Sequence, residues 1–183
     1  MGNFYTNFTL RGPSQQAVAK ALAGRSAIVT PAQDGSVVVF DEQSDEQDQA
    51  VIAELAARLS REFGCPLLAV LNHDDDIFWY QLYLSGELAD EYDSSPGYFD
   101  ASAEPSAPAG GDAHRLCAAF GASNVPEVES VLRKRRSTRA ATHSPSIGTL
   151  NLFAFSAFHP LESAQAIATL LMVRCRTVLL RTI

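Results

Sequence analysis

The sequence predicts an α+β protein with an antiparallel sheet in the ferredoxin-like order β-α-β-β-α-β, followed by an added β-hairpin and short C-terminal helices. Two observations predict this class. Short runs of β-branched and aromatic residues alternate with two stretches of helical periodicity, and turn residues separate them. A composition of 46% hydrophobic and 19% charged residues is typical of a chain that buries a core. In this order, two helices pack on one face of the sheet.

The N-terminal part supplies the first strand, the first helix and a hairpin. Gly12-Pro13-Ser14 ends the first strand and offers a helix N-cap, and Gly24 closes the helix that follows. Asp34-Gly35 separates two β-branched runs, which indicates a hairpin. The expected elements are a strand at 3–10, a helix at 15–23 and strands at 27–29 and 37–40.

The middle of the chain carries the clearest helix and a meander of three strands. Apolar residues recur at helical spacing between Asp48 and Gly64, and the acidic stretch 41–48 before them suits the positive end of a helix dipole. The nearly unbroken apolar run at 66–71 predicts a strand that is covered on both faces. The remaining expected elements are strands at 76–84 and 87–92, a loop at 94–111, and short helices at 112–120 and 126–132.

A hydrophobic core is expected where the middle helix meets the strands around it. The densest apolar pattern lies on that helix and on the third to fifth strands. We therefore expect one group of residues to be buried together: Val39, Leu55, Leu59, Leu68, Val70 and Leu82.

Charge divides the chain into two parts. Residues 1–130 hold 20 of the 21 carboxylates, whereas 8 of the 14 Lys and Arg residues lie after residue 130. We interpret 1–132 as an acidic α+β domain that includes the loop 94–111, and 133–183 as a basic tail whose pattern specifies little structure. A frameshift product without evolved function is our hypothesis for this tail.

Two stretches resemble a bacterial α+β family to which no activity is assigned. The first is GNFYTN at 2–7. The second lies within 71–99 and consists of LNHDDDIFWYQLY at 71–83 followed by GELADEYDSSPGYF at 86–99. The resemblance covers about residues 1–132, and the tail departs from it where the family continues with a charged helix. It supports the domain boundary and implies no reaction.

An aromatic cluster around the strand 76–84 is the main candidate for a binding surface. Alternation along this strand directs Phe78, Tyr80 and Leu82 to one face of the sheet and Trp79 and Tyr83 to the other. Two interpretations stay open: the segment 94–132 covers the second face, or aromatic residues there bind a partner. The candidates for partner binding are Trp79, Tyr83, Tyr92, Tyr98, Asp90 and Glu91.

A metal site is not expected. Asp74 and Asp76 beside His73 are weak candidates, because hard cations take clustered carboxylates but consecutive turn residues diverge. We interpret this stretch as a solvated turn. No cofactor motif occurs, and three widely spaced cysteines indicate reduced thiols, so we expect no cofactor and a cytoplasmic location.

These observations favour a non-enzymatic binding module, immunity-protein-like or regulatory, with an acidic face and an aromatic sheet surface. Its charge suits a basic protein partner and repels nucleic acid, and we expect no membrane association. The alternative is a small enzyme without a recognised motif that uses carboxylates such as Asp90, Glu91 or Asp93. Catalytic residues and the oligomeric state are left open.

Overall fold

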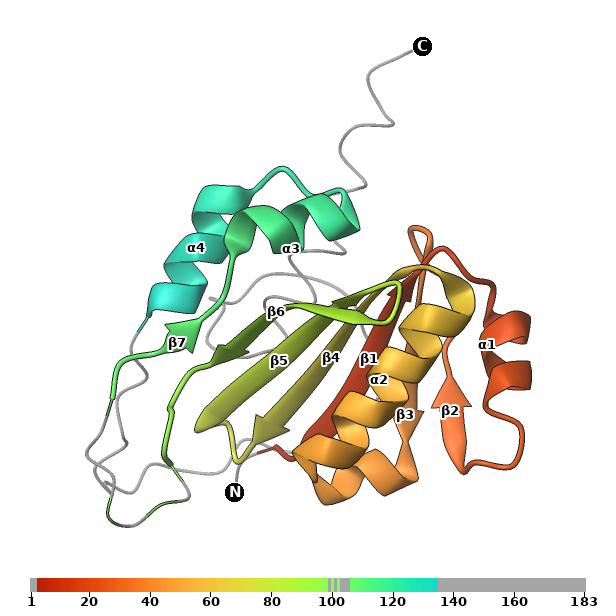
Figure 1. Cartoon of the computed structure of the whole chain (residues 1–183), viewed down its shortest axis with the longest axis horizontal. Coiled ribbons are helices and arrows are strands. Elements are labelled where there is room, and N and C mark those ends of the chain that lie inside the picture. Colours follow the sequence, from red (N-terminus) through yellow and green to blue (C-terminus); the bar gives the residue numbers. More distant parts are fainter. Residues whose placement is uncertain (1–2, 99, 101, 103–105, 135–183) are drawn as a thin grey trace, which may run out of the picture.

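Among the residues that the computed structural model describes, the strands form one seven-stranded antiparallel sheet (Figure 1). The structure describes residues 3–98, 100, 102 and 106–134, so nearly all of the predicted basic tail lies outside the described residues. In chain order the elements are β1 (Tyr5–Arg11), α1 (Gln15–Ala21), β2 (Ala27–Val29), β3 (Ser36–Asp41), the 3-10 helix η1 (Glu42–Glu46), α2 (Gln49–Phe63), β4 (Pro66–His73), β5 (Ile77–Leu84), β6 (Glu87–Asp93), β7 (Ala109–Gly110), α3 (Ala113–Phe120) and α4 (Val125–Arg133).

The strand order confirms the predicted topology. The order is β2-β3-β1-β4-β5-β6-β7, and every pair of neighbours is antiparallel. Its first four strands are arranged as in a ferredoxin-like sheet, with β5 and β6 added as a hairpin beside β4. Strand β1 therefore lies inside the sheet, between β3 and β4.

The stretch 94–111 is not all loop, because it contains β7. This two-residue strand pairs with the end of β6, where Tyr92 lies opposite Gly110. Gly110 has a φ of 71°, and a Cβ placed on it would collide with the backbone oxygen of Glu91. Only glycine permits this close approach, and a pairing of two residues leaves no periodic pattern in the sequence.

Side-chain caps fix the helix starts that the sequence predicts. The Asp48 carboxylate accepts hydrogen bonds from the backbone N–H groups of Ala50 and Val51 at the start of α2. Ser14 caps α1 in the same way, and Asp112 caps α3. Gly64 ends α2 in the left-handed conformation, with a φ of 56°. These caps satisfy backbone groups that the helix itself leaves unpaired.

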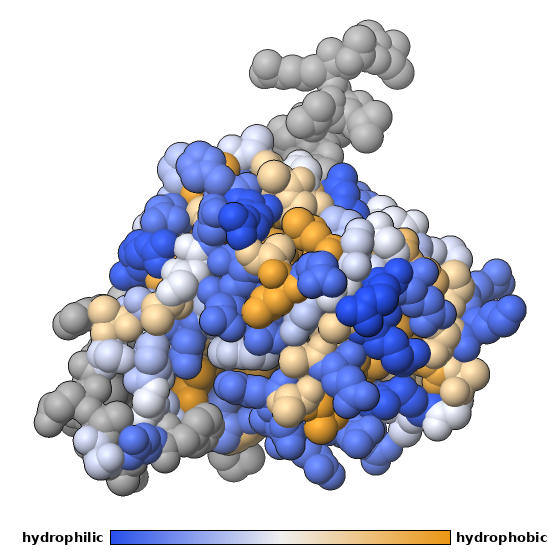
Figure 2. All heavy atoms as spheres, in the orientation of Figure 1, coloured by the Kyte–Doolittle hydropathy of each residue, from blue (hydrophilic) through white to orange (hydrophobic). Residues whose placement is uncertain are grey.

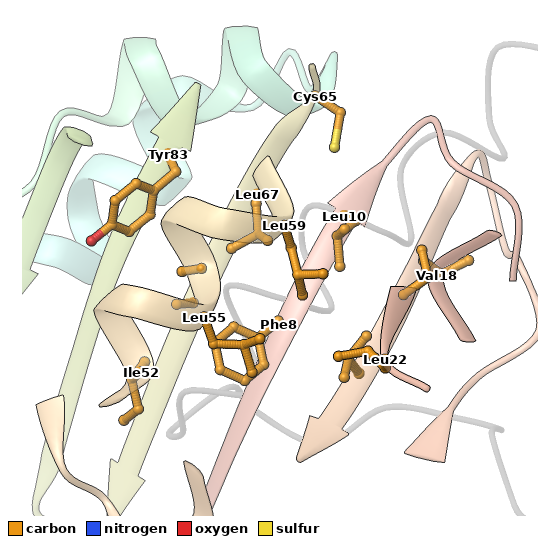
Figure 3. Packing of buried hydrophobic residues seen from close by; sticks show 14 of the residues in the cluster. Phe8, Leu10, Val18, Leu22, Ile52, Leu55, Leu59, Cys65, Leu67 and Tyr83 are labelled. Atoms are coloured by element: carbon orange, nitrogen blue, oxygen red, sulfur yellow. The ribbon is translucent and has the colours of Figure 1, made fainter. Parts of the chain in front are cut away.

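Two hydrophobic cores lie on opposite faces of the sheet, which corrects the expectation of a single one. Helices α1 and α2 cover the first face (Figure 3). Helices α3 and α4 cover the second face over β4, β5 and β6, to which Phe78, Tyr80 and Leu82 point. The segment after residue 94 therefore covers one face of the sheet, but the face of Trp79 and Tyr83 is covered by α1 and α2 instead. All six residues expected in the core are buried, but they divide between the two: Val39, Leu55 and Leu59 in the first, and Leu68, Val70 and Leu82 in the second.

The division follows from β4, which is covered on both faces as predicted. Its odd-numbered residues Leu67 and Ala69 belong to the first core, and the even-numbered Leu68 and Val70 belong to the second. Outside these cores, the surface on the side of α1 and α2 is mostly hydrophilic, with hydrophobic residues in small patches (Figure 2).

Candidate partner-binding surface

The turn between β4 and β5 lies at the same end of the sheet as the N-terminus (Figure 1). It consists of Asp74, Asp75 and Asp76, and the N–H of Asp76 donates to the carbonyl of His73 at 3.0 Å. Asp74 and Asp75 have φ values of 53° and 61°. Asp tolerates this left-handed conformation better than most residues. The turn therefore reverses the chain without glycine and places three consecutive carboxylates at the end of the sheet.

Asp75 fastens the N-terminal segment to this turn. Its carboxylate accepts hydrogen bonds from the backbone N–H and the side-chain amide of Asn3, at 3.2 Å and at 3.1–3.3 Å. The amide of Asn72, which is fully buried, donates to the carbonyl of Asn3 and to Asp75. These contacts join positions about 70 residues apart in the chain. They hold Phe4, the next residue, beside the turn.

Gln47 positions His73 from the other side. It follows η1 in the left-handed conformation, with a φ of 63°, and its amide donates to the carbonyl of Asn72. Its side-chain oxygen lies 2.6 Å from Nδ1 of His73. The imidazole ring in turn makes an edge contact with Phe4, with ring centroids 4.7 Å apart, and a second with Tyr98 at 6.3 Å. Phe4 and Tyr98 are 56% and 43% exposed, so two accessible aromatic rings flank one histidine.

Carboxylates are frequent on the segments that carry these rings. The four segments that meet here, residues 3–8, 41–50, 72–78 and 93–100, contain no Lys or Arg. Burial and the neighbouring carboxylates Asp76 and Asp74 raise the pKa of Tyr98, which donates a hydrogen bond to Asp76. We call this surface the acidic end and define it by Phe4, Asp45, His73, Asp74, Asp76 and Tyr98.

The structure divides the predicted partner-binding residues between the surface and the two cores. Trp79 and Tyr83 are 6% and 5% exposed and lie in the first core, and Tyr92 is 3% exposed and lies in the second. The protein's own helices therefore cover three of the predicted anchors. Tyr98 is exposed at the acidic end, and Glu91 is exposed on β6.

Asp90 takes part in a network that joins the sheet to α3. The buried Tyr80 hydroxyl donates to its carboxylate at 2.6 Å, and the same oxygen accepts from the N–H of Asp112, the N-cap residue of α3. Burial, and then the bonded Asp90, raise the pKa of Tyr80. The Tyr92 ring stacks on Tyr80 at 5.5 Å. This arrangement keeps Tyr80 protonated and connects elements of the fold.

The carboxylates of the enzyme alternative do not converge. Asp90 bonds to Tyr80 of the second core. Glu91 is on the opposite face of β6, near Tyr83 of the first core, where its charge helps to raise the pKa of Tyr83. Asp93 accepts from the N–H of Ser95 at the end of β6. One groove of about 250 Å³ lies beside α2 and another of about 340 Å³ lies beside α1, and neither has one of these carboxylates in its lining.

Within the part of the chain that the structure describes, no group of three His, Cys, Asp or Glu residues could hold a metal ion. Asp74 and Asp76, the weak candidates from the sequence, lie on one turn, and Asp76 accepts a hydrogen bond from Tyr98. Cys65 and Cys117 are buried free thiols, and burial raises the pKa of each. Protonated, buried thiols are poor nucleophiles and poor metal ligands.

The acidic end was only partly visible in the sequence. Tyr98 and the Asp turn carry a signal in the sequence, whereas Phe4 fits the predicted strand at 3–10 and nothing in the sequence marks Gln47. The signal for Phe4 is its apolar side chain just before β1, but its exposure depends on the Asn3–Asp75 contacts, which no local pattern shows.

Comparison of the chain with protein-family models, curated proteins and solved structures gives no match. The resemblance of residues 2–7 and 71–99 to a bacterial family therefore stays a prediction. None of the helices among the described residues is long and apolar enough to span a membrane.

Proposed function

We propose that this protein is a non-enzymatic binding module whose acidic end binds a basic segment of a protein partner. The observation that carries the proposal is the pair of exposed rings, Phe4 and Tyr98, on either side of His73 in a surface whose four segments contain no Lys or Arg. Immunity proteins and small regulatory modules are the classes to which such a function belongs.

The two kinds of side chain have different tasks in this proposal. Carboxylates attract a basic partner over a distance of about 10 Å at moderate salt, so they accelerate encounter and select against acidic partners. Aromatic rings supply contact area, and they also attract a Lys or Arg cation that lies over their faces. The acidic end thus combines steering with two candidate anchors in one place.

Preorganisation supports the proposal. Hydrogen bonds from Asn3, Asn72 and Gln47 hold the N-terminal segment and the His73 side chain before any partner arrives. A rigid surface loses less conformational entropy on binding than a mobile one. Phe4 and Tyr98 therefore need little rearrangement to contact a partner.

The test uses the full chain as bait in extracts of the source cells, with bound proteins eluted by salt and identified. We expect a partner with a basic surface, and we expect the double variant Phe4→Ala/Tyr98→Ala to bind it at least about tenfold more weakly. Leu84→Ala/Leu88→Ala is the matched control, because those side chains are 37% and 49% exposed at the other end of β5 and β6.

Kinetics separate the two tasks. Asp74→Asn/Asp76→Asn should slow association and weaken its salt dependence, whereas the aromatic variant should mainly speed dissociation. An acidic partner, or a partner that binds the aromatic variant and the control equally well, would contradict the proposal.

A further inference from the structure

The edge of the sheet at β2 presents backbone groups to the surface. In the described part of the chain β2 pairs with β3 alone, and it is the last strand in the sheet order. Ser26 accepts a hydrogen bond from Glu42, and Thr30 donates one to Val38, so positions 26 and 30 bond toward β3. Backbone groups alternate in direction along an antiparallel strand. The N–H and C=O groups of Ala27 and Val29 therefore point to the open side.

One of these groups already bonds to an amide. The side-chain Nε2 of Gln15 donates to the carbonyl oxygen of Val29 at 2.9 Å. Gln15 is the first residue of α1, and Figure 1 shows α1 beside β2 at this edge of the sheet. The carboxamide of Gln15 occupies the place that a peptide N–H of an added strand would take. The edge thus carries a hydrogen bond of the kind that strand addition makes.

A groove of about 340 Å³ runs between α1 and β2. Small and apolar side chains line it, with Ala19 and Leu22 on the side of α1 and Ala27 and Val29 on the side of β2. A groove bounded by a helix on one side and an open strand edge on the other suits an extended peptide, since backbone hydrogen bonds supply affinity and alternate side chains enter the apolar lining.

Charge distinguishes this groove from the rest of the domain. Residues 11–33 include Arg11, Lys20 and Arg25 but no Asp or Glu, although residues 1–130 hold 20 carboxylates. Of these three cations only Arg25 lines the groove, and its guanidinium is already bonded to Asp41 and Gln43. No Asp or Glu is among the lining residues, so an acidic residue of a bound segment meets no like charge there, whereas a basic residue faces Arg25.

We propose that the groove between α1 and β2 binds an extended, apolar peptide segment with an acidic residue, which adds to β2 as an antiparallel strand. The Gln15 carboxamide leaves the Val29 carbonyl when the peptide N–H arrives. This site is independent of the acidic end, and it takes a partner of opposite charge.

The probe is a synthetic peptide, acetylated and amidated, with the sequence SVVVFD of residues 36–41. That segment already pairs with the other side of β2, so its backbone and side chains are compatible with this strand. Titrated into the full chain and followed by amide NMR, it should shift the signals of Ala27 and Val29 and slow their hydrogen exchange at least about tenfold. The control peptide SVVVFK should bind more weakly, because its charge is reversed.

Three variants test the geometry. Ala27→Pro removes the outward N–H without removing a bond to β3, and it should weaken peptide binding about tenfold, whereas Ala27→Val keeps the N–H and should bind like the parent. Gln15→Ala frees the Val29 carbonyl and should strengthen binding. If Ala27→Pro does not fold, the same test can be made on the parent chain with a peptide that is N-methylated at alternate amides. The methylated peptide should then also bind about tenfold more weakly.

Two results would overturn the proposal. The first is slow exchange at Ala27 and Val29 in the peptide-free chain, which would mean that residues of the chain itself, or a second copy, occupy the edge. The second is peptide binding that Ala27→Pro, Gln15→Ala and N-methylation all leave unchanged, or that shifts only signals of the acidic end.

Discussion

The two faces of the sheet are closed in different ways. On the first face, α1 and α2 belong to the β-α-β-β-α-β unit, and their apolar side chains close a core that runs from β2 to β5. On the second face, α3 and α4 arrive after β6 and the stretch 94–108, and polar contacts accompany the packing. Tyr80 bonds to Asp90, Asp90 to the start of α3, and Tyr92 to the carbonyl of Leu132.

The two helical layers are specified by different kinds of contact. Apolar periodicity alone is enough to place α2, because its contacts come from strands close to it in sequence. The second layer depends on hydrogen bonds between residues up to 40 positions apart, such as Tyr92 and Leu132. We therefore expect the second layer to open more readily than the first in local unfolding.

The largest effect is expected in the first core. Leu59 is fully buried in α2, so Leu59→Ala should lower the free energy of unfolding by about 2–5 kcal/mol through lost burial and the cavity left behind. Urea denaturation measures it, with Leu88→Ala on the surface as the control. A loss of about 1 kcal/mol or less would show that this face contributes no more than an ordinary surface.

An intermediate effect is expected from the polar contacts of the second face. Tyr80→Phe removes the hydroxyl that donates to Asp90, and it should cost about 1–3 kcal/mol because Asp90 loses its bond to a buried donor. Hydrogen exchange should then accelerate in α3 and α4 more than in α2. Uniform acceleration in all three helices would mean that the two layers open together.

The first face contains one ion pair with a pH signature. Burial acts to raise the pKa of Asp41, but hydrogen bonds from Arg25 and Ser44 outweigh it and hold that pKa below its ordinary value of 3.8. The stabilisation is therefore present above pH 3.8 and is lost as the pH falls through the lowered pKa. The Asp41→Asn variant should be less stable than the parent above pH 3.8, and this difference in the free energy of unfolding should shrink as the pH falls below that value. Urea denaturation at a series of pH values measures it. A deficit that is constant with pH would contradict the assignment.

The smallest effect concerns the residues after α4. Near the end of the described residues, Arg133 donates hydrogen bonds to the carbonyls of Gly110 and Gly111, and the N–H of Lys134 donates to the carbonyl of Val131. A chain that ends at Lys134 should melt within a few degrees of the full chain, a change on the order of 1 kcal/mol. Loss of cooperative melting would instead make the basic tail part of the fold and would remove the main support for the frameshift hypothesis.

Much of the fold was predictable because its signals are local. Asp48 and Gly64 bracket α2, and the unbroken apolar run of β4 indicates burial on both faces. The separation into two cores was not predictable from apolar character alone, since Leu59 and Leu68 are equally apolar. Their opposite sides follow from the alternation along β4 and from which helices cover each face of the sheet.

The candidate site was less predictable for the same reason. Trp79 looks like a surface anchor in the sequence because Trp often is one, but α2 covers its face of β5. Phe4 gains its position from Asn3 and Asp75, which are 72 residues apart. Contacts of this kind follow from the tertiary arrangement and have no signature in local sequence.

The interior position of β1 also has a consequence during synthesis. Phe8 pairs with Val39 on one side and with Ala69 on the other, so β1 is synthesised about sixty residues before its last neighbour in the sheet. At about 5–20 residues per second, this delay lasts on the order of several seconds. Throughout this delay Phe8 and Leu10 lack the neighbours that bury them in the folded sheet, so β1 is a segment of the nascent chain to which chaperones can bind.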